Sequence, residues 1–367
     1  MSAPGIEYLF LTAGSLITLE GRITAFGASV RLGSLAPTYA LNRLGYNART
    51  FSISADSAGA EGAAASAKRV VFGEMFPTEG GWAGTAALYR RMLERISEPR
   101  ERVVFSIADD HFDDPHFRDF YRAALPHCRA VTTVSERLAG TLRQLTSRPV
   151  CIAPEPTEGE RGAPQAFVAR KPPAPLAWLA RRIGLSNDLW RVRLLWFGYL
   201  ANLPPLLEIL PQLETLARRH PLMLTLVTSP LDEINTLLTP ARTQEGADLR
   251  LQFLPWNPLI MDGVIAANDI VLIPSAYRDP VKQAKSPNRL VAGLHGGRFV
   301  VAHPLPAYAP YGGFAWIGEN LSQGVEWAIR HPREVVERIA RGQAYVDQQH
   351  SAEAVARFWL DVLDSAH

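Results

Sequence analysis

Short apolar runs alternate with helical stretches along most of the chain, and this alternation constrains the fold more than any other feature. Strands that are buried on both faces have continuous apolar runs, because helices cover both sides of their sheet. The pattern therefore predicts parallel sheets in a doubly wound α/β fold. In the first half we expect strands at 8–12, 48–53, 70–72, 103–107, 130–133 and 150–153, and helices at 36–44, 85–96, 117–125 and 135–145.

A break in this pattern divides the chain. Its 367 residues suggest two domains, and residues 158–175 are rich in Pro, Gly and Ala without a clear period. The alternation then restarts. We expect strands at 194–197, 222–227, 249–253, 270–273 and 299–302, and helices at 205–218, 232–238, 261–267, 288–295, 321–330, 332–347 and 352–363. We therefore predict a first domain over 1–157, a linker over 158–190 and a second domain over 191–349.

The composition narrows the class of protein. The net charge of +2 argues against a nucleic-acid binder, which would carry a strong basic patch. No apolar run reaches the roughly 18–20 residues of a membrane-spanning helix. The N-terminal segment lacks a basic start and contains Glu7, so it does not resemble a signal peptide. We expect a cytoplasmic protein, and its arginine-rich surface also allows peripheral contact with anionic lipid at the inner face of a membrane.

The strongest chemical signal follows the strand expected at 270–273. Lys282 and Lys285 lie in the loop, Ser286 suits a helix N-cap, and Asn288 and Arg289 fall in the first helical turn. Pro287 suits the first position of that helix. Exposed N–H groups and cations at a helix start favour an anion, and a phosphate or diphosphate is the natural ligand. The alternative is a solvated basic loop with an ordinary cap.

The loop after the strand at 194–197 is a second candidate. Gly198 would let a ligand approach the backbone closely, and Asn202 can donate or accept hydrogen bonds there. A single glycine after a strand also fits an ordinary tight turn. The position matters because this is the first strand-to-helix loop of the expected second domain.

The segment DDHFDDP at 109–115 follows the strand at 103–107. His111, flanked by Asp110, is a candidate general base oriented by a carboxylate. A Mg²⁺ or Mn²⁺ site is the alternative for these carboxylates. Asp113, Asp114 and Pro115 also suit the start of the next helix. Arg31 and Gly33, in a loop expected before the helix at 36–44, and Glu74, after the strand at 70–72, are weaker candidates.

Several segments, taken in their order along the chain, resemble the GT-B superfamily of glycosyltransferases, in particular the retaining bacterial group 1 enzymes. They are VTTVSERLAGTL, RPVCIAPEPTE, LLWFGYLANLPPLLEILPQLETL and DIVLIPSAYRDPVKQAKSPNRLVAGLHGGRFVVAHPLPAY. The resemblance implies two Rossmann-like domains facing a cleft, with the nucleotide-diphosphate sugar on the second domain and the acceptor on the first. It also implies that the final helix, within 350–367, crosses back to the first domain.

The resemblance assigns the donor diphosphate to Lys282, Lys285, Ser286, Asn288 and Arg289, with Gly198 and Asn202 opposite. Arg31, Gly33 and Glu74 lie in the expected first domain, so we expect them on the acceptor side. No metal or resident cofactor is implied, since the nucleotide sugar is a co-substrate.

One departure affects the expected chemistry. The family has two glutamates eight positions apart, and the corresponding residues here are Ala284 and Ala292. The resemblance still implies a glycosyltransferase that acts on a glycan, lipid-linked or protein acceptor, whereas the missing glutamates motivate a non-catalytic alternative. The alternatives are a binding module of the same fold that has lost catalysis, and a nucleotide-sugar epimerase, which would isomerise the sugar with no acceptor present.

Overall fold

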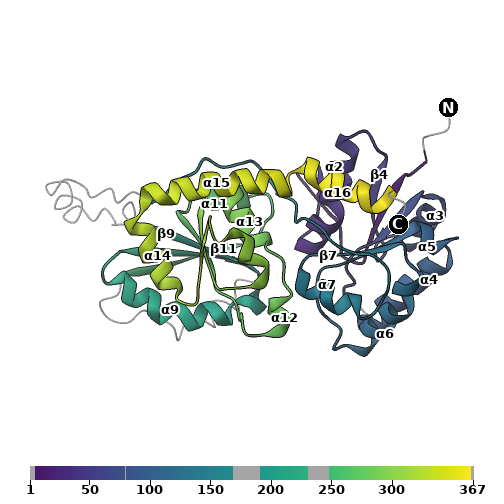
Figure 1. The fold of residues 1–367 in the computed structure, drawn as a ribbon, viewed down its shortest axis with the longest axis horizontal. Helices are drawn as coiled ribbons and strands as arrows, with labels where there is room; N and C mark the ends of the chain where they lie inside the picture. The colour runs from purple at the N-terminus through teal and green to yellow at the C-terminus, as the bar shows by residue number, and fades with distance from the viewer. Residues whose placement is uncertain (1–4, 79, 168–190, 230–247, 365–367) are drawn as a thin grey trace. The chain divides into compact units, whose positions relative to one another are not determined.

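Parallel six-stranded sheets form in both halves of the chain (Figure 1). The computed structural model describes residues 5–78, 80–167, 191–229 and 248–364. The helix expected at 232–238 and most of the linker expected at 158–190 lie outside the described residues. Unit 1 comprises Met1–Glu158, Gln283–Asn288 and Gln348–His367, and unit 2 comprises Gly159–Lys282 and Arg289–Asp347. Residues 283–288, expected within the second domain, thus group with unit 1.

The sheet of unit 1 has the order β4-β1-β5-β6-β7-β8, with every neighbouring pair parallel. Its strands match the expected ones to within a residue or two: β1 (Tyr8–Thr12), β4 (Ala48–Ser52), β5 (Arg69–Phe72), β6 (Val103–Ile107), β7 (Ala130–Thr133) and β8 (Val150–Ile152). The strand order reverses between β1 and β5, where Tyr8 pairs with Ala48 on one side and Arg69 on the other. Ligands of open α/β sheets bind outside the carboxyl ends of strands at such a point.

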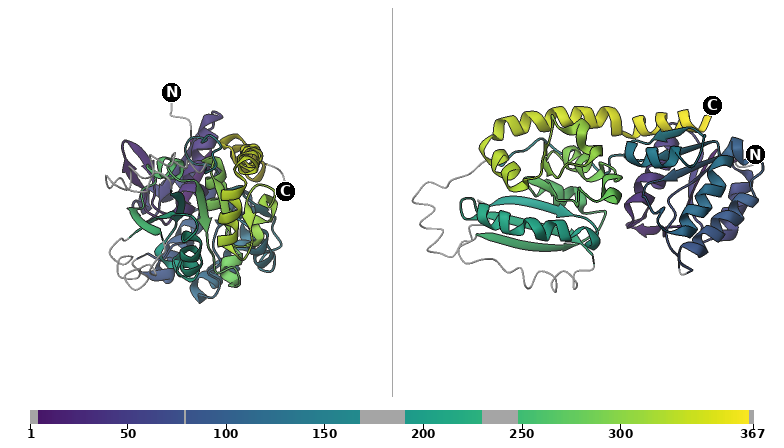
Figure 2. Two further views of the ribbon diagram at one scale, coloured as in Figure 1. Left: turned by 90° about the vertical axis from the view of Figure 1, so that its left-hand side faces the viewer. Right: turned by 60° about the horizontal axis from the view of Figure 1, so that its bottom comes forward.

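Helices cover both faces of this sheet (Figure 2). One face packs against α3 (Ser57–Ser66), α4 (Gly81–Glu94), α6 (Pro115–Ala124) and α7 (Glu136–Arg143). The other packs against α2 (Ala36–Arg43) and α16 (Ala352–Asp364), which lie side by side (Figure 1). Trp359 of α16 is buried with its ring centroid 5.1 Å from that of Phe10. The last helix therefore belongs to the core of unit 1.

Parts of unit 1 differ from the expected elements. The sequence analysis missed the hairpin of β2 (Ile17–Leu19) and β3 (Arg22–Thr24), the helix α3, and the short α5 (Pro99–Arg102) and η2 (Leu125–His127). The prediction of a loop at Arg31–Ser34 was also wrong. It is a π-helical turn, η1 (Arg31–Leu35), between α1 (Ala28–Val30) and α2, so helical backbone runs continuously from Ala28 to Arg43.

The sheet of unit 2 has the order β11-β10-β9-β12-β13-β14, again parallel throughout. Numbered along the chain, this is the 3-2-1-4-5-6 order of Rossmann folds, which reverses between β9 and β12. Its strands are β9 (Val192–Phe197), β10 (Leu222–Thr228), β11 (Leu249–Pro255), β12 (Ile270–Ile273), β13 (Phe299–Ala302) and β14 (Trp316–Ile317). The two-residue β14 was not expected. Both units thus have the doubly wound fold that the alternation predicted.

Two groups of helices cover this second sheet. One face packs against α9 (Pro204–Ala217) and α14 (Leu321–Arg330), and the other against α11 (Met261–Ala266) and α13 (Asn288–His295). The long α15 (Pro332–His350) and the short η4 (Leu200–Asn202), α12 (Pro280–Gln283) and η5 (Pro306–Tyr311) complete the elements. Within the residues that the structure describes, no helix has the length and apolar character needed to cross a bilayer.

Candidate active site

Four of the predicted donor-site residues gather at the carboxyl ends of β9 and β12 in unit 2. Lys282 Nζ, at the end of α12, donates to Asn202 Oδ1 at 2.8 Å. Arg289, in the first turn of α13, donates from Nη1 to the carbonyl of Phe197 at 3.4 Å. A Cβ added at Gly198 would lie 3.6 Å from that same Nη1 atom. Gly198, Asn202, Lys282 and Arg289 therefore form a cationic cluster at the strand reversal.

Tyr308 of η5 holds the guanidinium group of Arg289 in position within the cationic cluster. Its ring is buried, and its hydroxyl shares a hydrogen bond with Arg289. Burial raises the pKa of Tyr308, although the positive charge of Arg289 opposes the change. The phenol is neutral near pH 7, so Tyr308 places no negative charge beside Arg289. The sequence analysis missed Tyr308, which lies 19 residues after Arg289, and no local pattern marks it.

Lys285, Ser286 and Asn288 belong to unit 1, whereas the residues of the cationic cluster belong to unit 2. Lys285 forms an ion pair with Asp109, and Ser286 hydrogen-bonds the carboxyl group of Glu155. The expected grouping of Lys285 with Arg289 at a donor diphosphate stays a prediction. Asp109, after β6, and the buried Glu155, after β8, thus each bind one side chain of this segment.

Helix α13 has the expected bounds, Asn288–His295, but the residues before it are placed differently. Pro287 precedes the first helical residue, and Ser286 lies two residues before it. The hydroxyl of Ser286 is used by Glu155. The neighbouring carbonyl of Ala284 accepts a hydrogen bond of 2.6 Å from Ser135 Oγ. These contacts hold the segment before α13 in place.

Glu74 lies directly beyond β5, at the strand reversal of unit 1. It is 4% exposed, and its Oε2 accepts hydrogen bonds from the backbone N–H groups of Ala108 and Asp109, the latter at 3.2 Å. Burial, followed by the negative charge of Asp109, raises the pKa of Glu74 well above its ordinary value. Glu74 is thus a buried acid whose hydrogen bonds hold the loop after β6 in place.

That loop carries Asp109 and His111. Asp109 pairs with Lys285 through Oδ1, and its Oδ2 lies 3.8 Å from His111 Nε2. The ring of His111 packs against Trp82 of α4, with centroids 5.0 Å apart. Burial lowers the pKa of His111, the charge of Lys285 adds to this, and Asp109 opposes it. His111 is therefore a neutral imidazole near pH 7 and can accept a proton.

The structure corrects the partner of this histidine. Asp109, which the sequence analysis did not single out, is the nearest carboxylate to His111. Asp110 instead accepts a hydrogen bond from the N–H of Phe112 at 3.4 Å, within its own turn. Asp114 caps α6, as the sequence predicted, by accepting from the N–H groups of His116 and Phe117.

Glu155, beyond β8, is a further buried carboxyl group that the sequence analysis missed. Burial raises its pKa to about 7, although the hydrogen bond from Ser286 opposes the change. Its backbone carbonyl contacts His350 Nδ1 at 2.7 Å. The carboxyl ends of β5, β6 and β8 thus bring together an acidic cluster of Glu74, Asp109 and Glu155 around Lys285 and Ser286.

The predicted acceptor-side residues on the first helix have different roles. Arg31 is 6% exposed and makes a two-pronged contact with Glu158, from Nε to Oε1 at 2.8 Å and from Nη2 to Oε2 at 3.1 Å. Its Nη1 donates to the carbonyls of Ala25 and Phe26. These bonds hold the guanidinium of Arg31 in place, and its acceptor-side role stays a prediction. Gly33, by contrast, has open space where a Cβ would stand.

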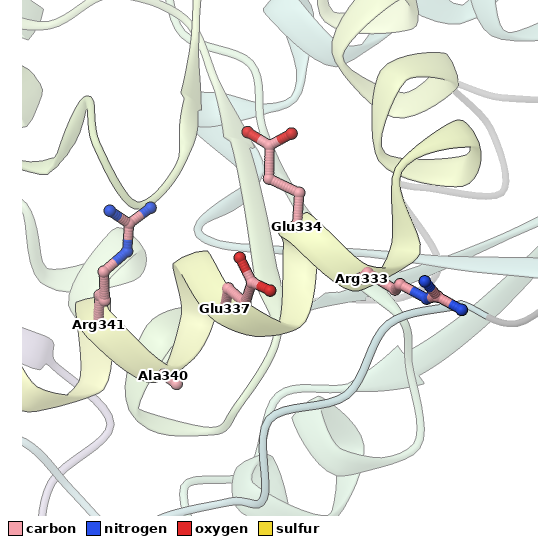
Figure 3. Close-up of a pocket in the computed structure, with 5 residues that line it drawn as sticks. All are labelled: Arg333, Glu334, Glu337, Ala340 and Arg341. Carbon is pink, nitrogen blue, oxygen red and sulfur yellow. The ribbon is translucent and has the colours of Figure 1, made fainter.

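A shallow hollow on α15 is separate from both clusters (Figure 3). Its lining comes entirely from that helix: Arg333, Glu334, Glu337, Ala340 and Arg341. The charges balance, and Glu334 is paired with Arg338 at 2.7 Å. The hollow lies at no strand end, and we assign it no role in the chemistry. Among the described residues, no group of three or more His, Cys, Asp or Glu side chains is placed to hold a metal ion.

Comparisons with solved structures identify the architecture. An alpha-glucosyltransferase in complex with UDP-glucose and DNA containing an abasic site matches at a TM-score of 0.64 and 12% identity, over 98% of this chain and 99% of that one. Anabaena HepE in complex with UDP-glucose matches at 0.61 and 13%, over 98% and 100%. A glycosyltransferase from Rickettsia africae matches at 0.57 and 11%, over 98% and 100%.

Sequence comparison adds nothing to these matches, because no family model and no curated protein matches the chain. The three structures are GT-B glycosyltransferases, and they match nearly the full length of the chain. The chain has the GT-B fold of two Rossmann-like domains, as the sequence resemblance predicted.

Proposed function

We propose that this protein transfers a sugar from a nucleotide-diphosphate donor to an acceptor hydroxyl. The cationic cluster of unit 2 is the observation that carries the proposal. It lies at the strand reversal, where open α/β sheets bind their ligands, and it provides Lys282 and Arg289 for a diphosphate. The likeness of the whole chain to glycosyltransferases that hold UDP-glucose supports the same conclusion.

In this proposal the cations stabilise the departing diphosphate. Negative charge develops on the leaving group in the transition state, and preorganised donors in a partly buried site stabilise that charge. One such donor contributes about 3 kcal/mol to lowering the barrier. Tyr308 keeps Arg289 in position for this role. Because protein cations supply the positive charge, we propose transfer that does not depend on a metal ion.

Unit 1 contributes the acceptor chemistry. His111 is neutral near pH 7, so it can remove a proton from an acceptor hydroxyl if the reaction inverts configuration. Asp109 then stabilises the imidazolium that forms. If the reaction retains configuration, the departing phosphate is itself the base and His111 positions the substrate. We propose a hexosyl donor and an acceptor in bacterial glycan or glycoconjugate synthesis.

The free thiols of Cys128 and Cys151 fit this reaction in a reducing, cytoplasmic compartment.

A binding module without catalysis is the second candidate. Ala284 favours it, because a buried alanine stands where related glycosyltransferases carry a glutamate. Ala284 is 2% exposed and packs in the core of unit 1.

Release of nucleoside diphosphate from a panel of nucleotide sugars tests the function. We expect release from one donor, slowed about tenfold or more in Arg289→Ala and in Lys282→Ala. Arg278→Ala is the matched control, because Arg278 lies in the same loop with its side chain 81% exposed. Binding without release would favour the binding module. An isomerised sugar formed without acceptor would indicate an epimerase.

A further inference from the structure

The two cations of the cationic cluster flank a segment that belongs to the other unit. Lys282 and Arg289 are in unit 2, whereas the six residues between them, 283–288, group with unit 1. We call these six residues the docked segment. Because Lys282 directly precedes the docked segment and Arg289 directly follows it, contacts that fix the segment also restrict the backbone of both cations.

A backbone contact and a core contact hold the docked segment on unit 1. The side chain of Ala284 is 2% exposed and packs in the hydrophobic core of this unit. The carbonyl of Ala284 accepts a hydrogen bond of 2.6 Å from the hydroxyl of Ser135, which is itself 4% exposed. Removing the donor of a buried carbonyl costs the desolvation of that carbonyl, so Ser135 fixes the backbone of the segment at this point.

Two side-chain contacts reinforce this attachment. Lys285 forms an ion pair with Asp109, and Ser286 hydrogen-bonds the carboxyl group of Glu155. Asp109, Ser135 and Glu155 follow β6, β7 and β8, which are neighbours in the sheet of unit 1. Three adjacent strand ends therefore each hold one of three consecutive residues of the docked segment.

We propose that Ser135 is a positioning residue for donor binding, which acts through the docked segment on Lys282 and Arg289. The inference rests on the proposed function, because that function assigns the diphosphate to these two cations. The segment is ordered before a ligand arrives, so the entropy of ordering the cations is not lost on binding. Ser135 needs no contact with the ligand, since the chain itself connects it to both cations.

The hydroxyl of Ser135 also caps α7, where it accepts from the N–H of Leu138 at 3.3 Å. A matched control must therefore lose a cap and nothing else. Asp56 caps α3 of the same unit by accepting from the N–H of Gly59 at 2.8 Å. Among the described residues, Asp56 makes no hydrogen bond or ion pair with the docked segment, so Asp56→Ala is that control. Ser135→Thr keeps the hydroxyl and is the conservative variant.

Hydrogen exchange of the full chain without ligand tests the attachment. We expect Ser135→Ala to speed exchange of the amides in 280–292 several-fold, because the docked segment is then held less tightly. Asp56→Ala should speed exchange only near α3, and Ser135→Thr should leave 280–292 unchanged. Faster exchange confined to α7 would show that Ser135 acts only as a cap, and would overturn the proposal.

Calorimetric titration with UDP, GDP and ADP tests the consequence for binding. We expect Ser135→Ala to weaken binding of the preferred diphosphate about fivefold, while Asp56→Ala and Ser135→Thr bind as the unaltered protein does. Unchanged affinity in Ser135→Ala would overturn the positioning role and leave the proposed function intact. If the unaltered protein binds none of the three, the proposed function and this role both fail, and faster exchange then reports a structural contact only.

Discussion

Two buried carboxyl groups in unit 1 each have one oxygen without a hydrogen-bond partner among the described residues, Glu74 Oε1 and Glu155 Oε2. An ionised carboxylate in such a place is costly, since no donor among the described residues bonds the second oxygen. Both groups therefore favour the protonated form, and burial is the main cause in each case. Because protonation of these groups is coupled to folding, the acidic cluster makes the stability of unit 1 depend on pH.

We predict that Glu155→Gln stabilises the protein increasingly as pH rises. The pKa of Glu155 is raised from 4.5 to about 7 in the folded state. Between these values the folded chain binds more protons than the unfolded chain, so wild-type stability falls with rising pH and the loss is complete above about pH 7. Glutamine keeps the contact with Ser286 and has no charge to bury. Urea unfolding at pH 4 and pH 8 measures the difference.

The stability difference between Glu155→Gln and wild type should grow by about 3 kcal/mol across that interval. Glu160→Gln, at an exposed position nearby, is the control and should show no such trend. A difference that is the same at both pH values would contradict the buried-acid account.

We predict opposite shifts in the pKa of His111 from its two charged neighbours. Asp109→Asn should lower the pKa, because a negative charge that stabilises the imidazolium is lost. Lys285→Met should raise it, because a positive charge is lost. Asp110→Asn is the control and should lower it less than Asp109→Asn. NMR titration of the imidazole protons gives all three values, and a larger effect of Asp110 would contradict the corrected pairing.

At the scale of elements, the start of α6 positions the loop that carries His111. Asp114 accepts two backbone N–H groups of the first turn, and Pro115 occupies the first helical position. The preceding turn is closed by the N–H of Asp114, which donates to the carbonyl of His111 at 3.0 Å. The cap and the turn thus share one residue.

We expect Asp114→Ala to destabilise the protein by about 1 kcal/mol, the usual effect of losing an N-cap. Asp113→Ala is the matched control, because Asp113 is exposed and caps nothing among the described contacts. Its effect should stay below about 0.5 kcal/mol. Denaturant unfolding measures both variants. Equal effects of the two substitutions would show that the cap bond is not the cause.

Local patterns account for the elements that the sequence predicted. Apolar runs such as those of β1, β6 and β13 are buried on both faces, so their bounds are correct to the residue. The helix α3 escaped detection because its sequence, SAGAEGAAAS, has no apolar period. The contacts of Lys285 with Asp109 and of Ser286 with Glu155 join residues far apart in sequence, and no local spacing encodes them.

At the scale of the whole molecule, the fold depends on the pattern of strands and helices more than on the identity of individual residues. The solved structures match over 98% of this chain at 11–13% identity. The two candidate clusters each lie at the carboxyl edge of their own sheet, the cationic cluster in unit 2 and the acidic cluster in unit 1. The cationic cluster is the feature on which the proposed function depends most.

Thermal unfolding with a panel of UDP, GDP, ADP, CMP and dTDP tests this cluster most directly. A ligand at ~100 times its dissociation constant adds about 2.7 kcal/mol to native stability, which raises Tm by several degrees. We predict that one diphosphate stabilises the protein, that Lys282→Ala and Arg289→Ala lose the shift, and that Arg278→Ala retains it. No shift with any nucleotide, or an undiminished shift in both cluster variants, would contradict the account.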